Sequence, residues 1–318
     1  MACEQEERAV LHSDPSTSMR IVIPGGSGFL GRSFATFARK RGYHCIVLTR
    51  NPRDEGDVQW DGRTMGDWAA AFDGAAAVVN FTGRSVNCVY NDANKKEIIE
   101  SRVNSVRAVD EAVAGCSDPP KVIVQAGSLA IYGDTTEPCG EDAPHGEGFG
   151  VEVCEVWEEE FFAQALPQTR KCFLRIGFVL GIGGGALEPL RTLTRCYLGG
   201  TVGKGNQFIS WIHIDDLNRM ILTCIENASL EGVFNATGPG PVTNRVFMKA
   251  MRKAAGRPWV PPAPAPLVRL GARLIMQTDA SLALAGRKCF PRRFSELGFV
   301  FNHTNLEQTL RDIMEGWG

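Results

Sequence analysis

The sequence lacks the features that mark several large classes of protein. No apolar run approaches the roughly 18 residues that span a bilayer. The 318 residues carry a formal net charge of −2, and no dense stripe of lysine and arginine is present, which argues against a nucleic-acid or anionic-membrane partner. With 44% hydrophobic and 22% charged residues, the composition is that of a soluble protein able to bury a full core.

Disulfide and metal signatures are missing as well. The ten cysteines contain no C-x-x-C pair, and the five histidines form no cluster with ligand spacing. This pattern predicts reduced thiols in a cytoplasmic protein and no metal site. Residues 1–18 are polar and acidic and lack the basic start and apolar core of a secretion signal, so we interpret them as a flexible tail, or as a segment preceding a true start at Met19.

Strand and helix patterns alternate through the first half of the chain, which predicts an α/β fold. We expect a doubly wound parallel sheet of Rossmann type, with right-handed crossovers. The expected strands cover residues 20–23, 45–48, 75–80, 121–125 and 172–175, and the expected helices cover residues 32–41, 94–114 and 151–165.

The pattern changes after about Gly177. A glycine-rich loop over residues 181–205 surrounds a short amphipathic helix, and Asp215 and Asp216 are good caps for a helix over 217–227. A proline-rich run precedes another helical stretch from Leu267. We therefore expect a nucleotide-binding domain over residues 19–180 and substrate-side elements over residues 181–318, with the chain crossing between them.

A glycine-rich turn follows the first strand. Gly26, Gly28 and Gly31 fit G-x-G-x-x-G in the context that gives the pattern meaning, between a strand and a helix. The early glycines allow a tight turn, Gly28 allows close approach of a pyrophosphate, and Gly31 allows the helix to pack closely. The alternative is a plain strand–turn–helix. We predict a dinucleotide site formed by Gly25, Gly26, Ser27, Gly28, Phe29, Leu30 and Gly31.

The end of the second strand indicates the type of dinucleotide. An acidic residue there would bind the ribose 2′-hydroxyl of NAD, whereas an arginine accommodates the 2′-phosphate of NADP. This chain has Arg50 and Arg53, with no acid before Asp54. Two solvated surface arginines are the alternative. NADP(H) is the predicted cofactor because a guanidinium suits a phosphate well.

Several separated motifs resemble the extended and atypical short-chain dehydrogenase/reductases. More specifically, the chain resembles an uncharacterised epimerase family with a C-terminal DUF1731 segment. The motifs are Gly25–Gly31, Asn80–Gly83, Ser101–Arg102, Ser128–Gly133, Trp211–Asp216 and Pro291–Phe299. The resemblance implies a Rossmann-like fold with a small C-terminal substrate lobe.

The same resemblance assigns roles to individual residues. It implies that Thr82 and Gly83 lie against the cofactor. It also matches Ser128 to the serine that binds the substrate carbonyl, although Ser128 could instead merely cap a turn. Arg102 resembles an arginine that replaces a usual asparagine near the cofactor, with an exposed helix arginine as the alternative.

The usual catalytic pair of this superfamily, Tyr-x-x-x-Lys, is missing. Gly150 aligns with the tyrosine and Cys154 with the lysine, so the ordinary proton donor is absent. Three substitutes are open: Tyr132, which in relatives packs on cofactor or substrate, Cys154, which could also be an inert buried thiol, and His213, which could be structural.

The surroundings of these residues complete the expected site. Gln207, Trp211 and His213 belong to a segment expected to close over the substrate together with the loop 181–205. The glutamates Glu155, Glu158, Glu159 and Glu160 are interpreted as a solvated helix face, and Trp157 between them as core.

Two functional hypotheses follow from the intact glycine turn and the missing pair. The first is an NADP(H)-dependent oxidoreductase or epimerase-like enzyme acting on an unidentified small molecule. The second is a non-catalytic NADP(H)-binding redox sensor or regulatory protein. Neither hypothesis involves nucleic acid or a membrane, and the oligomeric state is open, with a homodimer as one alternative.

Overall fold

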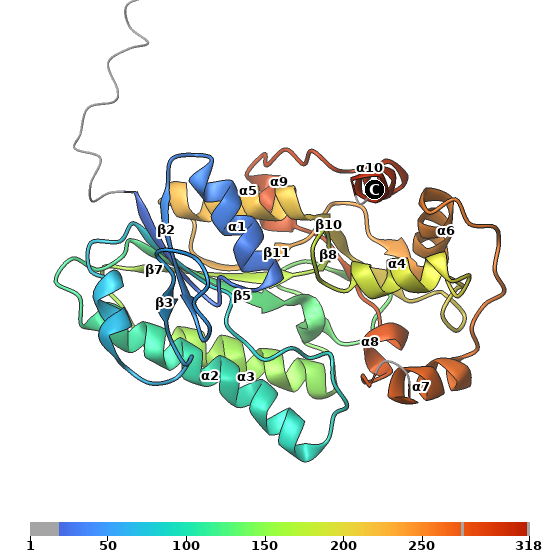
Figure 1. Cartoon of the computed structure of the whole chain (residues 1–318), viewed down its shortest axis with the longest axis horizontal. Helices are drawn as coiled ribbons and strands as arrows, with labels where there is room; N and C mark the ends of the chain where they lie inside the picture. The colour runs from blue at the N-terminus through green and yellow to red at the C-terminus, as the bar shows by residue number, and fades with distance from the viewer. Residues whose placement is uncertain (1–18, 275–276, 317–318) are drawn as a thin grey trace, which may run out of the picture.

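The computed structural model describes residues 19–274 and 277–316, and the predicted tail over residues 1–18 lies outside them. A seven-stranded parallel sheet forms the centre, in the order β11-β7-β5-β4-β1-β2-β3 (Figure 1). Its strands are β1 (Arg20–Pro24), β2 (His44–Thr49), β3 (Val58–Gln59), β4 (Ala77–Asn80), β5 (Val122–Ser128), β7 (Arg170–Ile176) and β11 (Gly232–Ala236). The predicted Rossmann-like α/β fold is therefore confirmed.

Helices cover both faces of the sheet, as a buried parallel sheet requires. On one face lie α1 (Phe29–Arg39) and α5 (Ile214–Glu226), and on the other α2 (Asp92–Ala114) and α3 (Phe149–Ala163) (Figure 1). The first face buries Phe34 and Met220 against the strands, and the second buries Val109 and Phe161. Strand order reverses at β1, and open α/β sheets bind ligands beyond the carboxyl ends of strands at such a point.

A third cluster of buried residues lies beside the sheet and joins α6 (Asn244–Ala254) and α10 (Leu306–Glu315). It contains Trp211, Phe247 and Leu310. The remaining helices are α4 (Leu187–Arg195), α7 (Ala265–Leu274), α8 (Ser281–Leu284) and α9 (Arg292–Glu296), with 3-10 turns η1 (Asp67–Ala71) and η2 (Leu129–Tyr132). Short strand pairs join β8 (Phe178–Leu180) to β10 (Trp211–His213), β9 (Phe208–Ile209) to β12 (Val242–Thr243) and β6 (Pro138–Cys139) to β13 (Lys288–Cys289).

The second half of the chain returns to the sheet, as the expected crossings require. β11 pairs with β7 in parallel register, from Gly232↔Cys172 to Ala236↔Ile176. α5 packs against the α1 side of the sheet. The five predicted strands were thus too few, since β3 and β11 were not predicted. Within the described residues, no helix is long and apolar enough to cross a membrane.

Candidate functional site

The glycine turn after β1 contains glycines that no side chain could replace without a clash, among them Gly25 and Gly31. Gly25 has φ +72°, and a Cβ there would lie 2.9 Å from the backbone N of Thr82. A Cβ on Gly31 would lie 2.5 Å from the Cα of Gly26. The turn therefore packs directly on the loop after β4 and on the start of α1. At Gly28, in contrast, a Cβ would meet only the Gly25 carbonyl oxygen, at 3.4 Å, so space beyond the turn is open.

The start of α1 offers free backbone donors. Its N-cap, Gly28, has no capping side chain, and the first turn contains no acidic residue. The first N–H groups of a helix have no acceptor within the helix, and the positive end of its dipole favours anions. The hydroxyl of Thr82, next to the turn, is buried and has no hydrogen-bond partner among the described residues. An uncapped helix start, a tight glycine cradle and an orphaned hydroxyl together fit a dinucleotide.

Basic side chains surround this turn. Arg50 and Arg53 follow β2 and are exposed, and among the residues with described structure neither side chain has a partner. The Ser27 hydroxyl lies 2.8 Å from the hydroxyl of Thr49, which ties the turn to the end of β2. Arg32 donates to the carbonyl of Ser27. This corner of the molecule can accept an anion that extends from the turn toward the end of β2.

The loop 181–205 reaches the same corner. At Gly184, with φ +156°, a Cβ would lie 2.8 Å from the Cβ of Phe29, so the loop packs closely on the first residue of α1. Leu30 is half-buried and packs against the core under the turn. Packing therefore holds the side chains of Phe29 and Leu30, and no backbone hydrogen bond within the described residues uses their N–H groups.

Ser128 ends β5 and is half-buried at the carboxyl edge of the sheet. Its hydroxyl accepts a hydrogen bond from the backbone N of Ala130 at 3.1 Å and so caps η2. A serine hydroxyl keeps its own proton to donate while it accepts one bond. Capping and ligand binding are therefore compatible at this residue.

The two positions of the missing catalytic pair lie beside Ser128. A Cβ on Gly150 would make ordinary contact with the Cβ of Ala130, at 3.5 Å. Cys154 is buried, with its thiol 3.7 Å from the Ser128 carbonyl oxygen. Burial, with a smaller contribution from Glu158, raises the pKa of Cys154 to about 12, although Arg102 and Arg287 lower it. The thiol stays protonated at neutral pH.

Tyr132 lies in a buried polar network behind the site. Its hydroxyl donates to the Oδ1 of Asn235 at 2.8 Å and accepts from Arg175 at 2.7 Å. Burial raises the pKa of the phenol to about 12, although Arg175 lowers it. To act on a ligand, this hydroxyl would have to leave both partners.

Arg175 also corrects the interpretation of the glutamate run on α3. Glu158 is buried and accepts hydrogen bonds from Nε and a terminal nitrogen of Arg175, at 2.7 and 2.8 Å. The prediction of a solvated face was wrong for this residue, because an arginine on β7 offered a partner that spacing along the helix cannot show. Glu155 and Glu159 are exposed, and Trp157 is buried in the core as predicted.

Arg102, on α2, is 9% exposed, so the alternative of an exposed helix arginine was wrong. A terminal nitrogen donates to the carbonyls of Ile98 and Arg84, at 2.8 and 3.1 Å, and the guanidinium lies 4.8 Å from the Trp157 ring centroid. Its Nε is buried without a partner in the described structure. A Cβ on Gly83 would lie 3.3 Å from its central carbon, so Gly83 and Arg102 are in contact.

Two of the substrate-side residues have structural contacts. The amide of Gln207 donates to the carbonyls of Val202 and Ala283, at 3.2 Å each. The indole of Trp211 is buried and donates to the Gly240 carbonyl at 2.8 Å. None of these hydrogen bonds brings either side chain next to Ser128.

His213 is the N-cap of α5, so the expectation that Asp215 and Asp216 cap this helix was wrong. Its Nδ1 accepts from the backbone N of Asp215, at 3.2 Å, and the helix begins at Ile214. Asp216, in the first turn, is buried and accepts from the backbone N of Asn302 and His303, at 3.0 and 2.9 Å. The two aspartates lie inside the helix rather than ahead of it.

The fold also brings together His213, Asp215 and His303, whose ligand atoms lie within 4.8 Å of one another. The sequence spacing of the histidines predicted no such cluster, and that prediction was wrong for these three residues. The two rings stack at 3.7 Å between centroids, and burial and His303 lower the pKa of His213.

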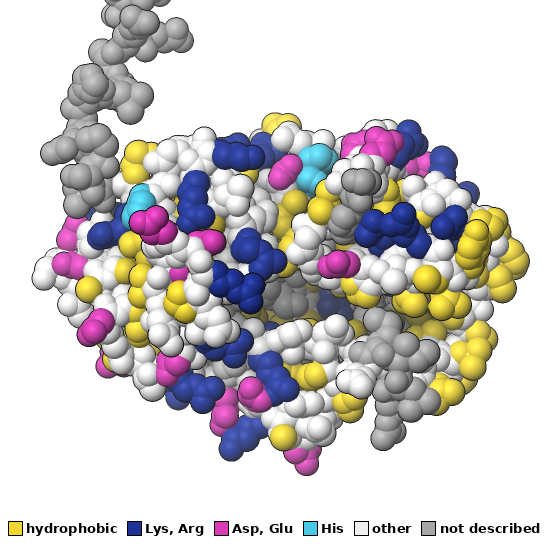
Figure 2. Space-filling view, viewed as in Figure 1, with side chains coloured by type: hydrophobic (Ala, Val, Ile, Leu, Met, Phe, Trp, Pro, Cys, Tyr) yellow, Lys and Arg dark blue, Asp and Glu magenta, His cyan; other side chains and the backbone are white. Residues whose placement is uncertain are grey.

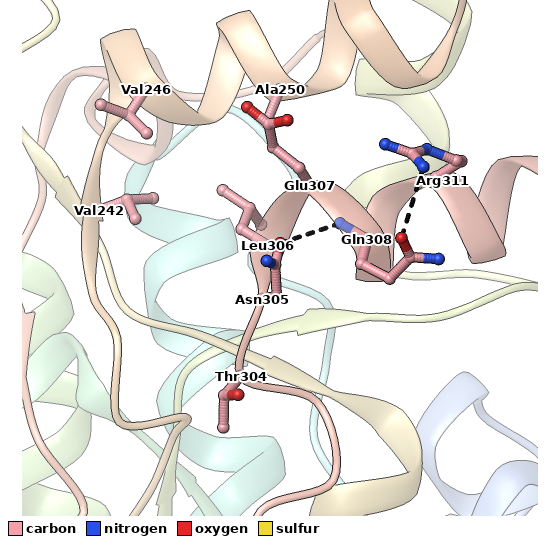
Figure 3. A pocket seen from close by; sticks show the side chains of 9 residues that line it. All are labelled: Val242, Val246, Ala250, Thr304, Asn305, Leu306, Glu307, Gln308 and Arg311. Atoms are coloured by element: carbon pink, nitrogen blue, oxygen red, sulfur yellow. Dashed lines mark hydrogen bonds between the residues drawn. The ribbon is translucent and has the colours of Figure 1, made fainter.

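The face seen in Figure 2 is hollowed near its middle, where β5 ends in Figure 1, and Lys and Arg side chains lie around one side of the hollow. A separate hollow of about 460 Å³ lies between α6 and α10 and is lined by Val242, Val246, Glu307 and Arg311 among others (Figure 3). It contains none of the predicted site residues, so it is a different surface from the glycine turn.

No role was predicted from the sequence for Arg287, which the fold brings close to Cys154. Arg287 lies in the segment between α8 and β13, and its Nε donates to the Gly133 carbonyl at 3.0 Å, next to Cys154. It stands four residues before the Pro291–Phe299 motif, but a local pattern cannot indicate its contact with Gly133, which is 154 residues away in the sequence.

Comparison with known families agrees with this geometry. Residues 21–237 match the NAD dependent epimerase/dehydratase family, and residues 263–313 match a domain of unknown function, DUF1731. The chain belongs to the NAD dependent epimerase/dehydratase family.

Particular relatives cover nearly the whole chain. The human epimerase family protein SDR39U1 is 31% identical over 93% of this chain and 100% of its own length. The chloroplastic SDR39U1 homolog of Arabidopsis thaliana is 31% identical over 95% of this chain and 89% of its own. The crystal structure of human SDR39U1 isoform 2 with NADPH superimposes with a TM-score of 0.85 at 30% identity, covering 93% of this chain and 99% of that one.

Proposed function

We propose that this protein is an NADP(H)-dependent oxidoreductase or epimerase-like enzyme acting on a small molecule. The observation that carries the proposal is the uncapped start of α1, held in a glycine cradle beside the exposed Arg50 and Arg53, whose side chains have no partner among the described residues. The NADPH in the structure of the human relative supports the choice of nucleotide.

In this proposal the backbone N–H groups from Phe29 to Gly31 bind the pyrophosphate, and Arg50 and Arg53 bind the 2′-phosphate. Thr82, Gly83 and Arg102 would hold the nicotinamide end. Bound NADP(H) supplies or accepts a hydride.

Ser128 orients the reacting carbonyl or hydroxyl through the proton that its capping bond leaves free. The proton itself comes from a group other than the usual tyrosine. One candidate proton donor is Cys154, whose pKa of about 12 makes its thiol a weak acid. The other candidate is a functional group of the substrate.

A paired titration of the nucleotide-stripped protein with NADPH and NADH tests the cofactor assignment. The native chain should prefer NADPH. Arg50→Glu should weaken NADPH binding by about 10- to 100-fold, since hydrogen bonds to charged groups contribute about 1.5–3 kcal/mol, and should change NADH binding little. Arg41→Glu, an exposed arginine stacked on Phe37 beyond the far end of α1, is the matched control and should leave both unchanged.

Equal losses of NADPH and NADH affinity in Arg50→Glu would reject the assignment of Arg50 to the 2′-phosphate. Failure of the native chain to bind either nucleotide would reject the proposed function as a whole.

A second candidate is a non-catalytic NADP(H)-binding redox sensor or regulatory protein. It is favoured by the positions of the missing pair, where Gly150 offers no side chain and Cys154 is a buried thiol. Oxidation of bound NADPH by any member of a carbonyl and enone panel, lost in Ser128→Ala, would support the enzyme. A change of oligomeric state on NADPH binding without turnover would support the sensor. The cytoplasmic location and the homodimer stay predictions.

A further inference from the structure

The segment that carries Arg287 is fixed between two parts of the fold. The backbone N of Gly286 donates to the Oδ1 of Asp134 at 2.8 Å, and the Gly286 carbonyl accepts from Thr135 at 2.8 Å. On the other side, the backbone N of Arg287 donates to the Phe208 carbonyl at 3.0 Å. A Cβ on Gly286 would lie 2.5 Å from the Phe208 oxygen, so no side chain fits between them.

The next residues fix the direction of the Arg287 side chain. The Arg287 carbonyl accepts from the hydroxyl of Ser210 at 2.8 Å, and the same hydroxyl accepts from the backbone N of Cys289 at 2.8 Å. β13 then pairs with β6. With its backbone held on both sides, Arg287 places its guanidinium against Gly133, at the end of the turn that Ser128 begins.

The guanidinium of Arg287 is not satisfied by the protein. Its Nε has the Gly133 carbonyl, but its two terminal nitrogens have no hydrogen-bond partner in the described ranges. Burial lowers its pKa, while Cys289, Cys154 and Asp134 raise it. Asp134, the acid among these neighbours, accepts from Gly286 and forms no ion pair with Arg287 within the described residues.

A second cation acts on the same thiol. Arg102 and Arg287 both lower the pKa of Cys154, and Arg102 also lacks a carboxylate partner in the described part of the chain. Arg287 is half-buried, and its terminal nitrogens are not enclosed by the described residues, so they are open to a ligand. The free fork of Arg287 has the geometry that binds a carboxylate or a phosphate through two parallel hydrogen bonds.

We propose that Arg287 binds an anionic oxygen group of the substrate, a carboxylate or a phosphate, beside Ser128. The C-terminal segment matched as a domain of unknown function thereby supplies a binding residue to the nucleotide-binding half of the molecule. This inference rests on the proposed function, because it places the anion in the same site, and it narrows the substrate class.

Calorimetric titration of the NADPH-saturated full chain tests the inference. The probes are benzoate, its neutral isostere benzamide, and inorganic phosphate, in a buffer free of other carboxylates and phosphates. The native chain should bind benzoate or phosphate at least about tenfold more tightly than benzamide. Binding of benzoate would indicate that Arg287 takes a carboxylate, and binding of inorganic phosphate would indicate that it takes a phosphate.

Arg287→Gln can keep a bond to Gly133 but removes the charge, and it should lose the preference for the anion. Arg287→Lys keeps the charge without the fork and should retain part of it. Arg292→Gln, in the same segment but on the surface and paired with Asp142 at 2.6 Å, is the control and should bind like the native chain.

The inference is overturned if neither anion binds to the NADPH-saturated native chain, or if Arg287→Gln binds anions as the native chain does. Because NADPH affinity is measured on every variant first, a failure of nucleotide binding is recognised separately as a failure of the proposed function. An anion preference that disappears in Arg287→Gln while NADPH affinity stays unchanged supports the inference.

Discussion

Replacing Arg175 by methionine should lower the stability of the protein far more than breaking a neighbouring ion pair of the same geometry. The Arg175 guanidinium is held by both carboxylate oxygens of Glu158, by the Tyr132 hydroxyl and by the Glu141 carbonyl at 3.1 Å. Its side chain is 5% exposed and that of Glu158 11%. Methionine fills much of the volume but leaves the carboxylate buried without a cation.

The expected cost is about 3–5 kcal/mol, the range for removing one partner of a buried ion pair. The pair Arg107–Glu160 is the matched control, because it is also bidentate, at 2.8 and 2.7 Å, and starts from the same helix α3. The Arg107 side chain is 64% exposed, so Arg107→Met should cost less than about 1 kcal/mol.

Guanidinium denaturation of the three proteins at pH 7 gives the comparison through the transition midpoint. A double variant, Arg175→Met with Glu158→Leu, should recover part of the loss because no unpaired charge stays buried. If Arg175→Met costs no more than Arg107→Met, the argument that burial makes the Glu158 pair different is refuted.

Two further predictions concern the glycine turn and a buried carboxylate. Gly28→Ala should fold normally but lose NADPH binding, because its Cβ projects into the open space where the pyrophosphate is proposed to bind. Gly31→Ala should lower the free energy of unfolding by about 1–3 kcal/mol, because its Cβ would lie 2.5 Å from the Cα of Gly26. Thermal unfolding and nucleotide titration separate the two, and normal NADPH binding by the Gly28→Ala variant contradicts the site. Burial raises the pKa of Asp110 to about 6 despite Lys171 at 2.8 Å, so the folded state holds a proton that the unfolded state releases near pH 4. Stability should therefore fall by about 2–3 kcal/mol as the pH rises from about 4 to about 6, and Asp110→Asn should remove this dependence; an unchanged pH profile in that variant would show that another group causes it.

Local patterns were enough to predict the parallel sheet and the glycine turn. The turn from Gly25 to Gly31 follows β1 and precedes α1 as expected. It could be predicted because the glycines that its close backbone contacts require lie within a few consecutive residues. The alternation of strand and helix patterns was likewise enough to predict the parallel sheet. β11 was missed since Gly232–Ala236 lies in the second half of the chain, beyond the regular alternation of strands and helices.

Features that depend on distant partners could not be predicted in the same way. Glu158 belongs to a run of acids on one helix, and only the position of Arg175 on β7 makes it a core residue. His213 and His303 meet because Asp216 holds the backbone of the C-terminal segment. The environment of Arg102 depends on how α2 faces α3, where Trp157 covers its guanidinium.

The clamp around Gly286 also has a consequence for the order of folding. Its bond to Asp134 joins residues 152 apart, and Arg287 can reach Gly133 only once that bond and the contact with Phe208 exist. Contacts between distant residues form late because loop closure must precede them. We therefore expect the glycine turn within residues 19–83, proposed to bind the nucleotide, to be able to form before the segment that carries Arg287 has been synthesised. Nucleotide bound at that stage would meet an incomplete site, and we expect the docking of the C-terminal segment to complete it.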